Sequence, residues 1–439
     1  MLYRKVEKEI EDHLRSSDKI MIIKGARQIG KSYIIRYACK QVFQNYIEID
    51  LASDKRDSGA YGKIRNTESL YLQLSADHGA HLGKYEDTVV FLDEIQEYPH
   101  LISMLKDLRG EKKYHFIASG SLLGITLRSG IFIPIGSVSL KDMYPLDFEE
   151  FLIASGVGEE VIGHIRNCFM ERKSLEEPLH DTILGHFKKY LLSGGLPDAV
   201  NAFLETTNIV TVRGIQSDIR ELYNDDAGRY EKDSGKKLKI RRIYGMIPSQ
   251  MGSKKKRLVF KEIEDDKGKR SDDYKDETDY LVDSGISLQV KAISNPHFPL
   301  TESETKNLLK LYMNDVGMLT GVLYHNNIRA VLDDESSINL GSVYETVVAQ
   351  ELSAHGHKLF YYDNKSHGEV DYLIDDYDNL SVLPLEVKSG KDYTIHSALD
   401  NFLHTNEYGV KNAIVFSNER EVKDVNGITH LPIYDIMFL

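Results

Sequence analysis

The sequence contains only two cysteines, Cys39 and Cys168, which lie far apart and have no CxxC or histidine spacing. This shortage argues against a disulfide framework and against a structural zinc site, and it fits a reducing cytosol. The chain also has no apolar run near the ~20 residues that a membrane-spanning helix needs, and no leader-type segment opens it. We therefore expect a cytoplasmic protein without a membrane contact.

The chain also lacks an excess of positive charge, since its net charge is −13. This charge argues against a protein that coats nucleic acid over its whole surface, but it does not exclude a local basic patch that binds nucleic acid. Apolar residues make up 41% and charged residues 28% of the 439 positions, an ordinary balance for a globular protein. Because this length is too great for one compact core, we expect roughly two to four domains.

A phosphate-binding loop is the first motif along the chain. An apolar run at residues 20–24 is followed by GARQIGKS and then by helical spacing in YIIRYACKQVF. Glycines between a strand and a helix let backbone N–H groups surround phosphates, and the helix N-terminus adds its positive end. Lys31 is expected to reach the β- and γ-phosphates of ATP, and Ser32 to hold Mg²⁺. The predicted nucleotide-binding residues are Gly25, Ala26, Arg27, Gln28, Ile29, Gly30, Lys31 and Ser32.

The run TVVFLDE at residues 88–94 has the pattern of a buried strand that ends in two acids. Asp93 would bind Mg²⁺ through water at the end of this strand, and Glu94 would polarise the water that attacks ATP. The alternative interpretation is that the two acids only face solvent at the end of a strand. The phosphate loop upstream favours the catalytic interpretation. An acid directly after the aspartate favours hydrolysis over a passive switch.

A third predicted strand, YHFIASGS at residues 114–121, ends in small polar residues. Ser119 or Ser121 could sense the γ-phosphate there, and a strand followed by a turn explains them equally well. Arg128 is the nearest arginine downstream. It is a candidate for a finger that reaches a neighbouring subunit, and a solvated loop arginine is the other interpretation.

The middle of the chain is expected to be mostly helical over residues 156–205, with a turn at residues 193–197. From Lys236 to Arg257 the composition changes to nine lysines and arginines without an acid. The first half of this stretch has helical spacing, and Pro248 then predicts a break. Together with a strand-like segment at residues 286–293, these features give a winged-helix outline.

Two interpretations of the basic stretch stay open. It can contact nucleic-acid phosphates, DNA more than RNA, with Lys254, Lys255, Lys256 and Arg257 on a wing or turn. It can also be a solvated face that balances the acidic run EDDKGKRSDDYKDETD just after it.

A candidate metal-dependent nuclease site lies near the C-terminal end, where Glu386 and Lys388 stand two positions apart in VLPLEVKSG. Such a triplet is common by chance, and residues 421–423 repeat it in a polar segment. Glu386 differs because its segment is an apolar strand, and because Asp371 and a predicted helix with Glu345 precede it. Side chains at positions i and i+2 share one face of a strand, so Glu386 and Lys388 point the same way.

The order of helix acid, strand, hairpin aspartate, ExK strand and helix is that of the PD-(D/E)xK nucleases. Asp371 and Glu386 would converge on Mg²⁺ from adjacent strands, and Glu345 would complete the coordination through water. Lys388 would orient or deprotonate the attacking water. The alternative is a nuclease fold that no longer cuts and serves docking or oligomerisation.

Six blocks taken in order resemble a widespread prokaryotic family of AAA-type ATPases whose C-terminal half is a domain of unknown function. The resemblance spans nearly the whole chain. Family members often carry an arginine after the glycine of the segment that matches IPIGS, where this chain has Ser137; Arg128 therefore remains only a candidate finger. The blocks are GARQIGKS, VVFLDEIQEYP, FIASGSLLG, MYPLDFEEFL, YLLSGGLPDAV and KLYMNDVGML.

The resemblance implies an α/β protein with four parts. These are an additional-strand P-loop core with a parallel sheet (residues 1–155), a helical segment (156–205), a winged-helix-like domain (206–330) and a domain similar to PD-(D/E)xK nucleases (331–439). Because AAA-type cores usually act as rings, it also implies a homo-oligomer. The expected function is an ATP- and Mg²⁺-dependent ATPase that acts on nucleic acid. The alternatives are an ATP-gated regulatory protein and a DNA-remodelling motor, each with an inactive nuclease fold.

Overall fold

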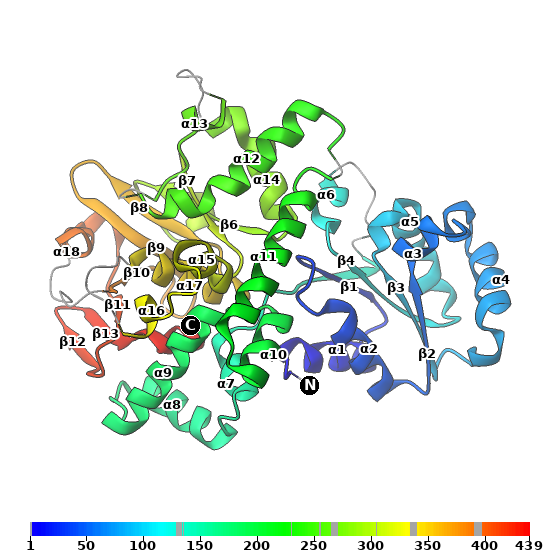
Figure 1. Cartoon of the computed structure of the whole chain (residues 1–439), viewed down its shortest axis with the longest axis horizontal. Coiled ribbons are helices and arrows are strands. Elements are labelled where there is room, and N and C mark those ends of the chain that lie inside the picture. Colours follow the sequence, from blue (N-terminus) through cyan, green and yellow to red (C-terminus); the bar gives the residue numbers. More distant parts are fainter. Residues whose placement is uncertain are drawn as a thin grey trace. The chain divides into compact units, whose positions relative to one another are not determined.

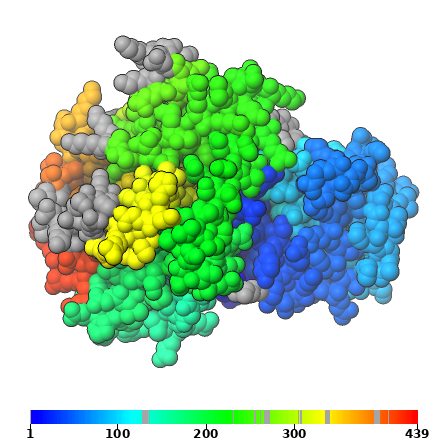
Figure 2. All heavy atoms as spheres, in the orientation of Figure 1, coloured from blue at the N-terminus to red at the C-terminus, as the bar shows by residue number. Residues whose placement is uncertain are grey.

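The computed structural model describes residues 2–128, 134, 136–229, 231–253, 256–264, 271–303, 305–333, 340–389 and 397–439. The chain divides into two compact units, which are treated separately below (Figures 1 and 2). Unit 1 comprises Met1–Tyr144 and Asp283–Gly285, and unit 2 comprises Pro145–Val282 and Ile286–Leu439.

Unit 1 is built on a five-stranded sheet in the order β2-β3-β4-β1-β5, in which all neighbours are parallel. Strand β4 pairs with β1 on one side and with β3 on the other, so it lies between the strand before the phosphate loop and the strand that ends in two acids. This arrangement confirms the expected α/β core with an additional strand. The strands are β1 (Ile20–Lys24), β2 (Asn45–Asp50), β3 (Thr88–Asp93), β4 (His115–Gly120) and β5 (Val138–Asp142).

Helices pack around this sheet (Figure 1). Residues of β3 are buried along the whole strand, as expected for a parallel strand that is covered on both faces. Leu101, Leu105 and Leu108 of α5 join Val90 and Leu92 of β3 in one apolar cluster, which holds the acidic strand end in place. The helices of unit 1 are α1 (Lys5–Ser16), α2 (Lys31–Val42), α3 (Leu51–Arg56), α4 (Thr67–His78), α5 (Pro99–Glu111) and α6 (Leu123–Arg128).

A short segment of unit 1, Asp283–Gly285, comes from far along the chain, between two segments of unit 2. Gly285 has a φ of +75°, and a Cβ atom at this position would lie 2.9 Å from the backbone nitrogen of Ala26. Ser284 is fully buried. The segment therefore packs directly against the phosphate loop, and the close approach requires glycine at position 285.

Unit 2 contains a mixed eight-stranded sheet in the order β12-β13-β11-β10-β9-β8-β6-β7. Strands β10, β11 and β13 are parallel neighbours, β6 and β8 are parallel, and the other neighbouring pairs are antiparallel. The strands are β6 (Ser287–Ile293), β7 (Thr305–Met313), β8 (Phe360–Asn364), β9 (Gly368–Asp376), β10 (Ser381–Val387), β11 (Ala413–Ser417), β12 (Lys423–Val425) and β13 (Ile428–Pro432).

The helices of unit 2 include α17, which packs against β6, β7 and β10. Its residues are buried on all sides, which explains why its sequence is apolar or small at most positions. The helices are α7 (Phe148–Ala154), α8 (Glu159–Glu171), α9 (Glu177–Ser193), α10 (Pro197–Thr206), α11 (Ile209–Asp226), α12 (Ser234–Met251), α13 (Lys261–Glu264), α14 (Lys275–Asp283), α15 (Val316–Tyr324), α16 (Arg329–Leu332), α17 (Gly341–Ala354) and α18 (Ser397–Leu403).

The structure differs from one expectation for the middle of the chain. Pro248 lies inside α12 and does not mark a break. It stands in the last turn of that helix, where the missing N–H removes a single hydrogen bond and three more residues still follow. In addition, β6 pairs in parallel with β8, so strands from residues 206–330 share a sheet with residues beyond 331. Unit 2 includes residues on both sides of residue 330.

Candidate functional site

The phosphate loop connects β1 to α2 through backbone conformations that suit glycine. Gly25 has a φ of +152°, and a Cβ atom there would lie 2.2 Å from the carbonyl oxygen of Met143. Gly30 precedes α2 with a φ of +89°. A side chain at position 25 would force the loop away from Met143, so the tight turn depends on glycine.

Lys31, the first residue of α2, is buried at the loop that it follows. Its Nζ donates hydrogen bonds to the carbonyl oxygens of Gly25 and Ala26, at 3.0 and 2.7 Å. It also lies 3.2 Å from the hydroxyl oxygen of Ser121, just after β4. The ammonium group is thus held between the phosphate loop and the end of β4, where phosphate oxygens would compete for its protons.

Asp93, at the end of β3, receives hydrogen bonds from two serines of neighbouring elements. The Ser32 hydroxyl donates to Oδ2 at 2.7 Å, and the Ser119 hydroxyl donates to Oδ1. Burial raises the pKa of Asp93 above its usual value, and the two hydroxyl donors oppose that rise. The predicted residues Ser32, Asp93 and Ser119 therefore meet at one carboxylate.

Glu94 follows Asp93 in a left-handed backbone conformation with a φ of +54°. Such a conformation is rare for a residue other than glycine and is common at functional sites. The Ser121 hydroxyl donates to its Oε1 at 2.6 Å, and the Gln96 amide donates to Oε2. Burial would raise the pKa of Glu94, but Lys31 and these donors outweigh it and lower the pKa. Glu94 is thus held as a carboxylate, the form that accepts a proton.

Ser121, which was predicted as an alternative to Ser119, contacts both Lys31 and Glu94. Two other contributors to this site, Gln96 and Arg4, were not predicted from the sequence. Gln96 lies two residues after Glu94 and had no motif to mark it. Arg4 is buried and donates to the carbonyl oxygens of Ile29 and Tyr144 at 2.9 and 2.7 Å, so it braces the end of the phosphate loop. No local spacing connects Arg4 to the loop.

The donor set fits Mg²⁺ held beside a nucleotide. Mg²⁺ usually binds through one or two protein oxygens and completes its octahedron with phosphate and water. The Ser32 hydroxyl and the Asp93 carboxylate supply oxygens of that kind, in direct contact with each other. In the ranges that the structure describes, no group of three or more His, Cys, Asp or Glu residues is placed to hold a metal ion. An all-protein metal cage is thus absent from the described part of unit 1.

The C-terminal set lies within unit 2. Glu345 projects from α17, Asp371 belongs to β9, and Glu386 belongs to β10, which pairs antiparallel with β9. The backbone N–H of Val387 donates to Oδ2 of Asp371 at 2.9 Å, and Lys388 contacts Glu386. Burial and the neighbouring Glu345 raise the pKa of Asp371 to about 7. The predicted residues are brought together on adjacent strands.

Lysines neutralise this acidic cluster from inside unit 2. Lys256 pairs with Glu345, and the Lys310 Nζ lies 2.8 Å from Glu369 and 3.7 Å from Glu345. Lys310 is only 1% exposed. Burial would raise the pKa of Glu345, but the charges of Lys310 and Lys256 outweigh it and lower the pKa. Lys310 was not predicted, because its neighbours come together only in the folded sheet.

The described end of the basic stretch turns toward the same sheet. Arg257 Nη2 lies 2.8 Å from Asp363 and 2.5 Å from Glu369. Lys256 and Arg257, expected on a wing or turn that contacts phosphate, are thus paired with carboxylates of unit 2. Lys254 and Lys255 lie outside the described residues, as does the side chain of Arg128.

Ion pairs occupy two carboxylates of this cluster in the structure. Glu345, Asp371 and Glu386 are not among any group of carboxylates arranged to hold one in the described ranges. Lys256 contacts Glu345, and Lys388 contacts Glu386 as expected for two residues on one face of a strand. We therefore derive no metal-dependent step at this cluster.

Comparison with known families gives three consecutive matches. Residues 17–152 match an AAA domain, residues 184–328 match a domain of unknown function (DUF8612), and residues 340–436 match another (DUF4143). A comparison with curated proteins found no match. None of the helices in the described ranges is long and apolar enough to cross a membrane.

Solved structures with a similar arrangement have low identity. A Walker-type ATPase of Pyrococcus abyssi is 13% identical, with 73% of this chain and 95% of that chain covered and a TM-score of 0.42. The RuvB Holliday junction branch migration motor of Thermotoga maritima is 14% identical, with coverages of 65% and 89% and a TM-score of 0.27. AMPPCP-bound DnaA from Aquifex aeolicus is 14% identical, with coverages of 56% and 78% and a TM-score of 0.26.

All three TM-scores are below 0.5, so the assignment rests on the family match and on the geometry of unit 1. The match covers the five strands of the parallel sheet, the phosphate loop, and Asp93 and Glu94 at the end of β3. Residues 17–152 of this chain contain an AAA-type P-loop ATPase domain.

Proposed function

We propose that the chain binds ATP with Mg²⁺ and hydrolyses it at the carboxyl ends of β1, β3 and β4. One observation carries this proposal. The Ser121 hydroxyl lies 3.2 Å from the Lys31 ammonium and 2.6 Å from Oε1 of Glu94. The lysine that would bind phosphate and the carboxylate that would accept a proton therefore meet at a single hydroxyl group.

The residues of this site take separate roles in the proposal. Lys31 binds the β- and γ-phosphates, and Ser32 and Asp93 hold Mg²⁺, with Ser119 fixing the Asp93 carboxylate. Bound Mg²⁺ neutralises charge that develops on the phosphate oxygens. Glu94 orients the attacking water and accepts its proton. The phosphate loop supplies backbone N–H groups from Gly25, Ala26, Arg27, Gln28, Ile29 and Gly30.

Substitution of Lys31 tests this proposal most directly. We expect Lys31→Ala in the full chain to abolish phosphate release from ATP, because the β- and γ-phosphates lose their cation. Lys106→Ala, which removes an exposed lysine of α5, is the matched control and should hydrolyse ATP normally. Normal hydrolysis by Lys31→Ala would overturn the assignment of the site.

For unit 2 we propose a contact with nucleic acid, DNA more than RNA, through the basic residues between Lys236 and Arg257. The support is the concentration of positive charge in a chain whose net charge is −13. Binding of this kind weakens as the salt concentration rises. The protein displaces cations from the phosphates when it binds, and added salt opposes that release. A salt titration of oligonucleotide binding, repeated after substitution of these residues, tests the contact.

Cleavage of the nucleic acid by Asp371, Glu386 and Lys388, with Glu345 nearby, stays a prediction. The pairing of Lys256 with Glu345 favours the alternative, in which the acids form an internal charge network. The assay incubates the full chain with single- and double-stranded DNA and RNA in Mg²⁺ or Mn²⁺, with and without ATP. Cleavage that is lost in Glu386→Ala and retained in Glu421→Ala supports the nuclease. No cleavage by the unsubstituted chain supports the network.

The homo-oligomer that the family resemblance implies is also a prediction. AAA-type sites often receive an arginine from the next subunit. The mass of the full chain in solution, with and without ATP, tests the assembly. A monomer under both conditions would contradict it.

A further inference from the structure

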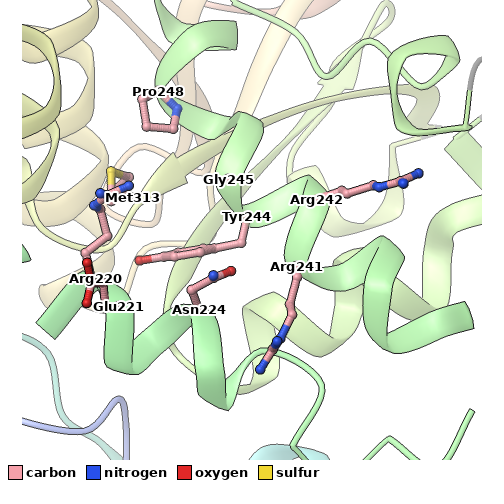
Figure 3. Close-up of a pocket in the computed structure, with 9 residues that line it drawn as sticks. All are labelled: Arg220, Glu221, Asn224, Arg241, Arg242, Tyr244, Gly245, Pro248 and Met313. Atoms are coloured by element: carbon pink, nitrogen blue, oxygen red, sulfur yellow. The ribbon is translucent and has the colours of Figure 1, made fainter. Parts of the chain in front are cut away.

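A pocket of about 410 Å³ lies between α11, α12 and the end of β7, all within unit 2 (Figure 3). Its size is in the range of small-molecule sites, which is roughly 300–1,000 Å³. Helices α11 and α12, drawn in green, reach the surface on the face that Figure 2 shows. The pocket belongs neither to the ATP site nor to the acidic cluster around Glu345.

The lining of this pocket is rich in arginine. Arg220 comes from α11, Arg241 and Arg242 come from α12, and Glu221 is the single acid among the lining residues. In a chain with a net charge of −13, a pocket with three arginines and one acid is locally positive. Such a lining favours an anionic ligand.

The charge of these arginines is only partly compensated within the fold. Arg220 forms no ion pair or hydrogen bond with the residues that the structure describes. Arg241 contacts Asp225 at 3.1 Å, but that carboxylate is 75% exposed, so solvent screens the pair. Arg242 donates one hydrogen bond to the carbonyl oxygen of Ile263, and Figure 3 shows its guanidinium group pointing away from Tyr244.

A buried hydroxyl group at the pocket provides an independent observation. Tyr244 is 3% exposed, and its hydroxyl has no hydrogen-bond partner among the described residues. Figure 3 shows its ring extending from α12 toward α11, with the hydroxyl on the side of Arg220. The Nε of Arg241 is likewise buried without a partner. Buried polar groups are normally satisfied, so these donors indicate a ligand that accepts hydrogen bonds.

Apolar groups complete the lining. Pro248 and Met313 border the pocket near the Tyr244 ring. A bare phosphate ion would use only the arginines and the hydroxyl group and would leave this apolar wall uncovered. A phosphate joined to a sugar and a base would cover both parts, because arginine binds phosphate with several N–H groups and flat rings pack on apolar side chains.

We propose that this pocket binds a nucleotide unit, with its phosphate on Arg220 and the Tyr244 hydroxyl. The sugar or base packs against Pro248 and Met313. The unit belongs either to a nucleic-acid strand or to a free nucleotide. In the first case the inference deepens the nucleic-acid contact proposed for unit 2, and in both cases it is independent of ATP hydrolysis and of cleavage.

The experiment uses the full chain with Lys31→Ala, so that the ATP site does not contribute. Two probes are compared, a fluorescent 20-nucleotide DNA strand read by anisotropy and free AMP read by calorimetry. Arg220→Gln is expected to weaken binding of one probe at least about tenfold, and Tyr244→Phe about fivefold. Lys232→Gln removes one exposed charge just before α12 and should have little effect. The thermal unfolding midpoint of each variant verifies that the fold is kept.

Each outcome decides a separate question. Weaker DNA binding in Arg220→Gln and Tyr244→Phe supports a strand as the source of the nucleotide, and weaker AMP binding alone supports a free nucleotide. If the chain binds no DNA, the proposed nucleic-acid contact fails while the AMP measurement still tests the pocket. Binding of both probes that is unchanged in the two variants, or no binding of either probe, overturns the pocket proposal.

Discussion

The Ser32 hydroxyl donates a hydrogen bond of 2.7 Å to Asp93, which joins the end of the phosphate loop to the end of β3. Ser119, at the end of β4, donates to the other oxygen of the same carboxylate. Residues from three segments of the chain therefore meet at Asp93. The predictions for the ATP site follow from this convergence and from the carboxylate of Glu94 beside it.

Glu94→Gln should separate nucleotide binding from hydrolysis. The amide keeps the size of the side chain but cannot accept a proton from water, so we expect the rate of phosphate release to fall by about 10²–10⁴. Binding of a fluorescent ATP analogue should change little. Glu68→Gln, an exposed acid of α4, is the control. Loss of binding together with hydrolysis would mean that Glu94 supports the fold of the site and does not act on water.

Ser119→Ala should shift the acid limb of the pH–rate profile to higher pH. The Ser119 hydroxyl favours the charged form of Asp93, and burial already raises the pKa of that residue. Removal of the hydroxyl raises the pKa further, so the carboxylate that would hold Mg²⁺ is lost at a higher pH. Hydrolysis rates between pH 5 and 8 measure the shift. Ser103→Ala on α5 is the control, and superimposable profiles would remove Ser119 from the site.

Asp371→Asn should change how stability depends on pH. The folded pKa of Asp371 is about 7, above its unfolded value, so folding favours the protonated carboxyl. Its contribution is fully present below the unfolded pKa near 4 and is lost as the pH rises through 7. The stability of the unsubstituted chain relative to Asp371→Asn should therefore fall between pH 5 and 8.

Urea unfolding at those two pH values measures the effect. Asp378→Asn, which changes an exposed acid in the turn after β9, serves as the control and should give a curve parallel to that of the unsubstituted chain. A parallel curve for Asp371→Asn as well would show that the carboxyl does not titrate in this range.

Lys310→Met should destabilise the chain far more than loss of an exposed lysine. Lys310 is buried and lies 2.8 Å from Glu369 and 3.7 Å from the buried Glu345. Removing one partner of a buried ion pair typically costs about 3–5 kcal/mol, and we expect a loss near the lower end because Lys256 still contacts Glu345 and Arg257 still contacts Glu369. Lys423 lies 3.5 Å from Glu421 in an exposed pair, and Lys423→Met should cost less than about 1 kcal/mol. The free energy of unfolding in urea compares the two variants. Equal losses would contradict the internal charge network.

The ATP site was predictable because its chemistry is confined to continuous segments. Residues 25–32 stand between a strand and a helix, and Asp93 and Glu94 end a strand, so local patterns were enough. Ser119 was one of two serines considered, and both contact the site. The order of strands around Asp371 and Glu386 was also predictable, because each acid lies within its own apolar segment.

Contacts between distant segments were not predictable in this way. Arg4 donates hydrogen bonds to the carbonyl oxygens of Ile29 and Tyr144, and no periodic pattern in the sequence predicts these contacts. The turn at Gly194 and Gly195 after α9 also depends on a distant residue. The N–H of Gly195 donates a hydrogen bond of 2.7 Å to the buried Asp315, and no local pattern predicts this contact. Pro248 shows a local rule that failed, since a proline in a last helical turn costs only one hydrogen bond.

The position of Asp283–Gly285 in unit 1 bears on how the protein folds during synthesis. Domains usually fold from the N-terminus as the chain emerges from the ribosome. Here the segment that packs against Ala26 is translated only after most of the helices of unit 2. The nucleotide site therefore reaches its final packing only once residue 285 has been made, and a fragment that ends at residue 144 would lack part of its own core.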